Sequence, residues 1–175
     1  MSAHFSFKAS LAGFLLVLQC LLVPVCAADI VSLRFQVPSF IQLESESSSL
    51  TLLFSDFSPG AESEPARMEY MIMANNVTRQ RGVLMAQIDS KDPDLDLQAQ
   101  FDGFNNLGGN ALLVQTPKEF VTLTDRDVLL ADKTPVSGSG KTVRGTFGIL
   151  YKARAIKELT AGTRIKTIKL TFTDV

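Results

Sequence analysis

The sequence is poor in the side chains that most catalytic and metal sites use. Its 175 residues include two cysteines, one histidine and no tryptophan. His4, Cys20 and Cys26 all lie within the first 28 residues, so the remainder has neither imidazole nor thiol. General bases, nucleophiles and zinc sites usually draw on those two groups. We therefore expect a domain without catalytic residues, disulfides or a cofactor.

The first 28 residues have the pattern of a cleavable signal peptide. Lys8 precedes an uncharged apolar run over 11–25, and small residues close it at Ala27 and Ala28. The run is shorter than the roughly 20 apolar residues that span a bilayer, although an uncleaved anchor is an alternative. We expect residues 1–28 to be the signal peptide and residues 29–175 a single secreted domain. The domain would be periplasmic, cell-surface or extracellular, with no stable membrane insertion after cleavage.

Charge is nearly balanced in the predicted domain. Residues 29–175 contain sixteen basic and eighteen acidic side chains. Nucleic-acid-binding domains and proteins that bind anionic membranes usually carry a basic excess. We therefore expect neither nucleic acid nor a membrane surface as a partner.

Apolar and polar residues alternate along much of this domain. In residues 30–37 the apolar side chains occupy one face and the polar ones the other, which predicts a half-buried strand. The apolar positions of this segment are Val31, Leu33, Phe35 and Val37. Further strands are predicted at 40–43, 50–54, 68–74, 82–89, 95–102, 111–114, 120–124, 127–131, 143–155 and 168–172, and only 153–159 could form a helix.

Short strands at regular spacing, separated by Gly, Pro and Asn, are typical of two packed sheets. The predicted fold class is all-β, an antiparallel two-sheet Ig-like β-sandwich of about eight or nine strands. An outer-membrane barrel is the rival topology. It requires strands of about ten residues and aromatic girdles, whereas this chain has two tyrosines and several strands of half that length.

Two segments resemble ligand-binding motifs. Residues 137–142 (SGSGKT) approach a phosphate-binding loop, but Pro135 replaces its first glycine and a strand pattern follows where a helix is required. The alternate spacing of Asp92, Asp94 and Asp96 resembles the start of a calcium loop whose later glycine and glutamate are missing, and a weak calcium site would involve Asp89, Asp92 and Asp94. A flexible loop over 134–141 and a weak calcium site, or simply solvated acids, are the expectations that remain.

Residues 102–110 are predicted to form a Gly- and Asn-rich loop. Phe104, Asn105 and Asn106 place an aromatic ring beside two amides, a combination that can bind a glycan by stacking and hydrogen bonding. Phe104 folded back as a plug on the core is the alternative. Asn76 begins an Asn-Val-Thr sequence that matches a glycosylation acceptor.

The order of strands resembles bacterial secreted Ig-like surface subunits, such as pilins and spore-coat-type fimbrial proteins. An alternating strand directly follows the leader at 30–37, an apolar strand follows at 50–54, and an alternating strand closes the chain at 168–172. Gly162 stands fourteen residues from the end, as in many pilins, whereas Asp174 replaces their penultimate aromatic residue. The resemblance implies a structural or adhesive role outside the cytoplasm.

We therefore expect a non-enzymatic subunit that assembles with copies of itself or with other surface proteins. Val31, Leu33, Phe35 and Val37 are the candidate partner-binding residues, because an extended terminal strand can add to a neighbour's sheet. Pairing of the same strand within its own domain is the alternative. A rival function is a binding module that holds a glycan or calcium in the 102–110 and 134–141 loops.

Overall fold

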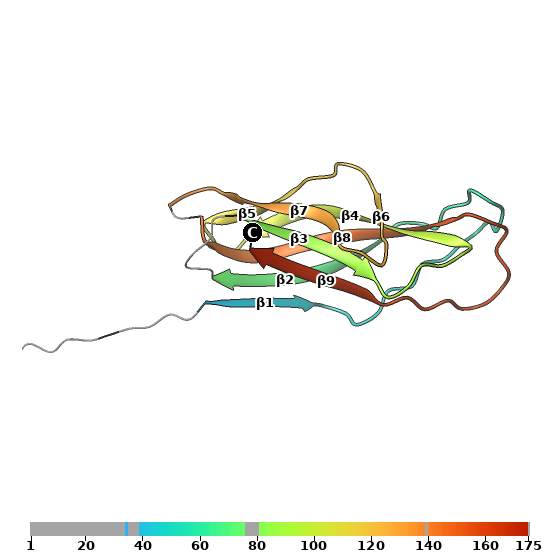
Figure 1. Ribbon diagram of the computed structural model, residues 1–175, viewed down its shortest axis with the longest axis horizontal. Helices are drawn as coiled ribbons and strands as arrows, with labels where there is room; N and C mark the ends of the chain where they lie inside the picture. Colours follow the sequence, from blue (N-terminus) through green and yellow to red (C-terminus); the bar gives the residue numbers. More distant parts are fainter. Residues whose placement is uncertain (1–33, 35–38, 76–80, 139, 175) are drawn as a thin grey trace, which may run out of the picture. The chain divides into compact units, whose positions relative to one another are not determined.

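Nine strands and no helix make up the part of the chain that the structure describes. The computed structural model describes Arg34 and residues 39–75, 81–138 and 140–174, and all nine strands lie in one unit, residues 37–175 (Figure 1). The all-β prediction is confirmed. The strands are β1 Phe40–Ser45, β2 Ala66–Asn75, β3 Gly82–Ile88, β4 Leu95–Asn106, β5 Ala111–Gln115, β6 Val121–Thr122, β7 Val128–Pro135, β8 Thr142–Ala155 and β9 Ile168–Asp174.

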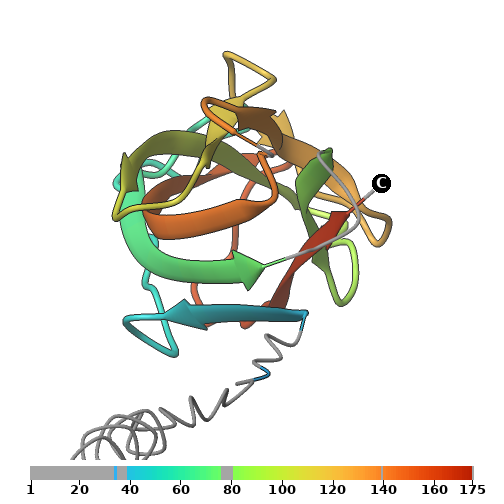
Figure 2. The same cartoon turned by 90° about the vertical axis from the view of Figure 1, so that its left-hand side faces the viewer.

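The strands form one sheet that curls around a shared core (Figure 2). The long strand β8 pairs antiparallel with β2 on one side and β4 on the other, and β1 and β6 extend this group. A second group runs β5–β7–β3–β9, also antiparallel. One parallel bridge, Ala111 to Val143, joins the groups. The sheet is therefore mixed and continuous, whereas two separate antiparallel sheets were expected.

Alternation in the sequence places the core as predicted. In β8 the odd-numbered side chains from Val143 to Ala155 are buried, and Arg144 and Arg154 are exposed. Phe147 lies at the centre, with Tyr70 and Phe101 stacked on it at ring-centre distances of 5.3 and 5.5 Å. The same inward pattern holds for β2, β3 and β4.

The predicted loop at 102–110 is shorter than expected. Strand β4 continues to Asn106 through a register shift between Asp102 and Phe104. Gly103 makes this possible with a φ of 71°, which a glycine adopts without strain. The predicted loop at 134–141 is also shortened, since Thr134 and Pro135 still pair with β5.

Other predicted elements are absent or reduced. Residues 50–54 belong to no strand, 153–159 form no helix, and the strand expected at 120–124 is only β6. An alternating pattern favours an extended chain, but a strand also requires a neighbour to hydrogen-bond, and 50–54 has none in the described part of the chain.

Several predicted features lie outside the described residues. These are the signal peptide at 1–28, the first strand with Val31, Leu33, Phe35 and Val37, and the acceptor Asn76.

Candidate functional site

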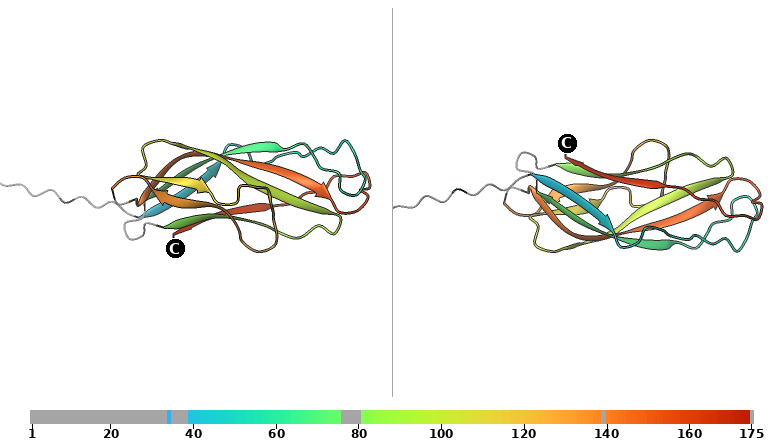
Figure 3. Two further views of the ribbon diagram at one scale, coloured as in Figure 1. Left: turned by 90° about the horizontal axis from the view of Figure 1, so that it is seen from above. Right: turned by 90° about the horizontal axis from the view of Figure 1, so that it is seen from below.

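A half-open groove of about 950 Å³ lies where the curled sheet does not close. The strands β1 and β9 form its two margins: β1 pairs with β2 alone and β9 with β3 alone among the described strands. Seen from below, β1 and β9 run at an angle to each other on the near side of the sheet (Figure 3, right). The groove therefore opens between two strand edges whose backbone groups have no ladder partner.

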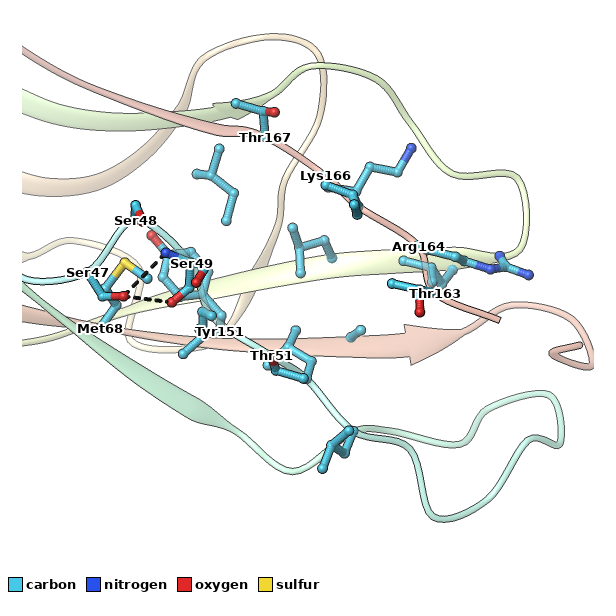
Figure 4. Close-up of a pocket in the computed structure, with 18 of the residues that line it drawn as sticks. Ser47, Ser48, Ser49, Thr51, Met68, Tyr151, Thr163, Arg164, Lys166 and Thr167 are labelled. Atoms are coloured by element: carbon cyan, nitrogen blue, oxygen red, sulfur yellow. Dashed lines mark hydrogen bonds between the residues drawn. The ribbon is translucent and has the colours of Figure 1, made fainter. Parts of the chain in front are cut away.

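Irregular segments continue both margins. Residues 47–57 follow β1 and residues 159–167 precede β9, and most of them line the groove. Figure 4 shows the labelled residues Thr163–Thr167 apart from Ser47–Thr51, with Met68 and Tyr151 beside Ser47 and Ser49. Within 47–57 one backbone bond reaches the other segment, from the Leu159 amide to the Phe57 carbonyl. The other hydrogen bonds are local: the Ser49 amide donates to the Ser47 hydroxyl, which donates to the Ser49 carbonyl, and Asp56 accepts from the Ser58 amide. Between these contacts, the described backbone of 50–54 and 160–166 makes no backbone hydrogen bond and is available for pairing.

Apolar side chains gather around this opening. Leu52 and Phe54 turn inward and pack against the core. Leu53, Phe57 and Ile165 stay in solvent, with 73%, 53% and 84% of their surface exposed. Exposed apolar side chains therefore accompany the groove on both of its irregular margins.

Two tyrosines form the floor of the groove. The Tyr70 and Tyr151 hydroxyls lie 2.9 Å apart, and the Tyr70 hydroxyl donates to the Met68 sulfur at 3.0 Å. Burial raises the pKa of both phenols above the ordinary value of 10.0, and for Tyr151 the neighbouring Tyr70 raises it further. Both hydroxyls are therefore neutral and satisfied by each other, which leaves the floor uncharged and suited to apolar groups.

A cluster of charged residues lies at one end of the groove, and Glu44 of β1 lines it as well. Arg164 contacts Asp92 through Nη1 at 2.8 Å and Asp94 through Nη2 at 3.2 Å, and Lys166 Nζ lies 3.9 Å from Asp92. Lys157 Nζ is 3.4 Å from Asp94. The acids predicted as a calcium site are thus paired with cations.

The third acid of that prediction is used locally. The Asp89 carboxylate accepts from the Ser90 amide. No group of three or more His, Cys, Asp or Glu side chains that could hold a metal ion occurs among the described residues.

The candidate glycan residues are spread by the local structure. Phe104 packs against the core, as the plug alternative predicted, and its ring lies where a side chain on Gly145 would collide. The side-chain oxygen of Asn106 accepts from the backbone amides of Gly108 and Gly109, and its side-chain nitrogen donates to the Gly109 carbonyl. Asn105 is exposed. Neither the ring nor the Asn106 amide is directed to a common ligand position.

The segment that resembles a phosphate-binding loop lies in a connection between two strands. The described residues of 136–141 join β7 to β8, with Gly140 packed closely against Pro135. The Lys141 carbonyl accepts from Lys133 Nζ at 3.2 Å. No helix follows to direct its N-terminus at a phosphate, since β8 begins at Thr142.

Comparison with protein families and with curated proteins found no relative of this chain. No protein-family model matches the chain, and no curated protein matches it. The described residues also contain no helix long and apolar enough to cross a membrane.

Sequence reasoning did not locate the groove. Its lining residues come from segments far apart in the chain, 43–57, 68–70, 95–97, 151–153 and 159–170. One signal was present: the apolar run 50–54 predicts a strand, and the structure gives it no partner.

Proposed function

We propose that the chain is a secreted, non-enzymatic structural or adhesive subunit that acts through protein–protein assembly. The observation that supports this most directly is the groove between β1 and β9, which has an apolar floor and two unpaired extended walls. An enzyme would need convergent reactive groups, and the groove floor instead holds two neutral, mutually bonded phenols. The leader pattern at 1–28 supports export.

The partner that fits such a groove is an extended strand. Edge backbone groups give affinity through hydrogen bonds, and pockets for alternate side chains give specificity. A small apolar ligand would satisfy the floor but would leave the backbone of 50–54 and 160–166 without hydrogen-bond partners. A strand between β1 and β9 would also complete an Ig-like sandwich, with β1–β2–β8–β4–β6 facing β5–β7–β3–β9.

The occupant that we propose is residues 30–37 of a second copy. This segment has an apolar face formed by Val31, Leu33, Phe35 and Val37, and its only charge is Arg34 on the other face. It therefore matches an uncharged floor on one side and solvent on the other.

The chain geometry disfavours insertion of this segment into its own groove. A tight hairpin onto β1 would place Pro38 and Ser39 in a two-residue turn, which requires a positive φ at its first central residue, and proline cannot adopt one. The same hairpin would also place Arg34 opposite the half-buried Leu43. A three-residue turn over 37–39 commonly needs a positive φ at its last residue, and Ser39 does not have one.

Two charged pairs of substitutions test this proposal. The full chain carrying Leu33→Asp and Phe35→Asp places two carboxylates on the apolar face. The control chain carrying Ser32→Asp and Gln36→Asp adds the same charge to the polar face. Burial of a large apolar side chain contributes about 1.5–3 kcal/mol, so we expect the first pair to weaken assembly by more than about a hundredfold and the control to assemble normally.

The measurement is molar mass by light scattering over a range of protein concentrations. Mass that increases with concentration in the unmodified chain and in the control, but not in the Leu33→Asp/Phe35→Asp chain, would support the proposal. An unmodified chain that stays monomeric throughout, or apolar-face substitutions that leave assembly intact, would overturn it.

A further inference from the structure

One wall of the groove is attached to the domain mainly by side chains. This segment, residues 160–166, is the later part of the connection between β8 and β9, and we call it the strap. Backbone bonds hold the chain on either side of it: the Leu159 amide donates to the Phe57 carbonyl and the Asp89 amide to the Thr167 carbonyl. Between these two points, the described backbone hydrogen bonds include none from the strap.

Arg164 makes the central attachment of the strap. Its guanidinium reaches two carboxylates of the β3–β4 connection, Asp92 and Asp94, at 2.8 and 3.2 Å. Lys166 adds a contact to the Ser90 hydroxyl at 3.3 Å. The Asp92 side chain is only 10% exposed and that of Arg164 27%, so water screens this pair less than a surface pair.

Alternation along the strap explains what this attachment does. Arg164 and Lys166 are half-buried on the same side as Ile168 and Leu170, whereas Ile165 is on the exposed side. The ion pairs therefore fix both the position and the rotation of the strap. They hold its backbone at the groove margin (Figure 4).

We infer that Arg164 is a positioning residue that keeps the groove open for a strand. This inference rests on the proposed function. Without Arg164 the strap keeps only the Lys166 contacts to Ser90 and Asp92 between Leu159 and Thr167, and the groove that it lines offers the apolar side chains of Leu97, Tyr151 and Ala153. A strap that covers this floor must be displaced before a strand can enter, and such reordering lowers the affinity for the partner.

The test measures binding of a capped peptide of residues 29–38 to the full chain carrying Leu33→Asp and Phe35→Asp. In that chain the native segment cannot compete for the groove. Tyr70 and Tyr151 are the only tyrosines in the sequence and both lie at the floor, while the peptide contains none. Tyrosine fluorescence therefore reports directly on occupation of the groove.

Three further substitutions are compared in this background: Arg164→Gln, the conservative Arg164→Lys, and Arg126→Gln as an exposed arginine outside the groove lining. We expect Arg164→Gln to weaken peptide binding by about threefold to thirtyfold, the range typical of substitutions that act indirectly on a site. Arg164→Lys should recover part of the affinity, and Arg126→Gln should change nothing.

Salt gives a second measurement. The capped peptide carries one negative and one positive charge, Asp29 and Arg34, so its net charge is zero. Screening should then act mainly on the Arg164 contacts, and added salt should weaken binding to the parent chain more than to the Arg164→Gln chain.

The outcomes separate the two proposals. If the parent chain binds the peptide and Arg164→Gln binds it equally well, the positioning role is wrong and the strand-binding groove stands. If the parent chain does not bind the peptide, the proposed strand docking fails and this inference fails with it. Weaker binding by Arg164→Gln, partial recovery with lysine and a reduced salt effect would together establish the positioning role.

Discussion

The buried tyrosine pair gives a prediction in which two substitutions cost less together than separately. Tyr70→Phe removes the hydrogen-bond partner of the Tyr151 hydroxyl, and Tyr151 is only 1% exposed with no other partner among the described residues. An unsatisfied buried hydroxyl costs about 1–3 kcal/mol. Tyr151→Phe should cost less, about 1 kcal/mol, because the Tyr70 hydroxyl still donates to the Met68 sulfur at 3.0 Å.

The double variant Tyr70→Phe/Tyr151→Phe removes both hydroxyls and leaves the ring packing unchanged. Replacing both partners with apolar groups of the same shape is nearly neutral, so the double variant should be more stable than Tyr70→Phe alone. Urea unfolding followed by circular dichroism measures all four free energies, with equal slopes required for the comparison. Strictly additive losses, or a larger loss for Tyr151→Phe than for Tyr70→Phe, would refute the hydrogen-bond chain described here.

Two further predictions concern the same core. Because both phenols have a raised pKa in the folded state, the unfolded chain loses its phenolic protons first, and stability should fall as the pH increases above about 10. Phenolate absorbance should therefore appear together with unfolding. Phenolate formation in the folded protein would contradict this. Gly145→Ala should cost about 1–3 kcal/mol, because the new methyl group would meet the Asn105 carbonyl and the Phe104 ring. Gly148→Ala should cost less than Gly145→Ala, because the atoms nearest its new methyl group are the end of the flexible Arg67 side chain, whose pairs with Glu69 and Asp102 lie at the surface and are worth little; equal effects in thermal melts would contradict the packing around β8.

Period-two alternation was sufficient to predict the all-β class and most of the strands. In β2, β4 and β8 it located both the strand and its buried face, because one side of each strand meets a core and the other meets water. It does not encode which strands are neighbours. The parallel bridge between Ala111 and Val143 depends on how β4 continues into β5, and no local pattern reports that.

The predicted end of β4 was wrong for a different reason. Glycine and asparagine at 103–110 are typical of a loop, and the prediction ended the strand at residue 102. Gly103 instead acts within the strand, where its positive φ absorbs one extra residue and lets Phe104 return to the core. Hydrogen bonds typical of a loop begin only at Asn106, whose side-chain oxygen accepts from the amides of Gly108 and Gly109.

The acids at 92 and 94 show how spacing alone misleads. Alternate aspartates resemble a cation site, although the glycine and glutamate that complete a calcium loop are missing from the sequence. The cations that pair with them, Arg164 and Lys166, are about seventy residues away in the chain and reach them only through the fold. The same carboxylates that predicted a metal therefore hold the groove wall in place.

The unpaired run at 50–54 connects the failed strand prediction with the proposed function. Its alternation has the character of a strand, with Leu52 and Phe54 packed inward, yet it has no ladder partner in the described chain. The segment at 30–37 has the same strand character and, under the proposal, lies in a second copy. A strand inserted at the groove would give both segments a neighbour and would cover Leu53 and Phe57, which are now in water. Amide hydrogen exchange gives the sharpest comparison: assembly should slow exchange in 50–54 and 160–167 together, and unchanged exchange there in assembled protein would mean that assembly uses another surface.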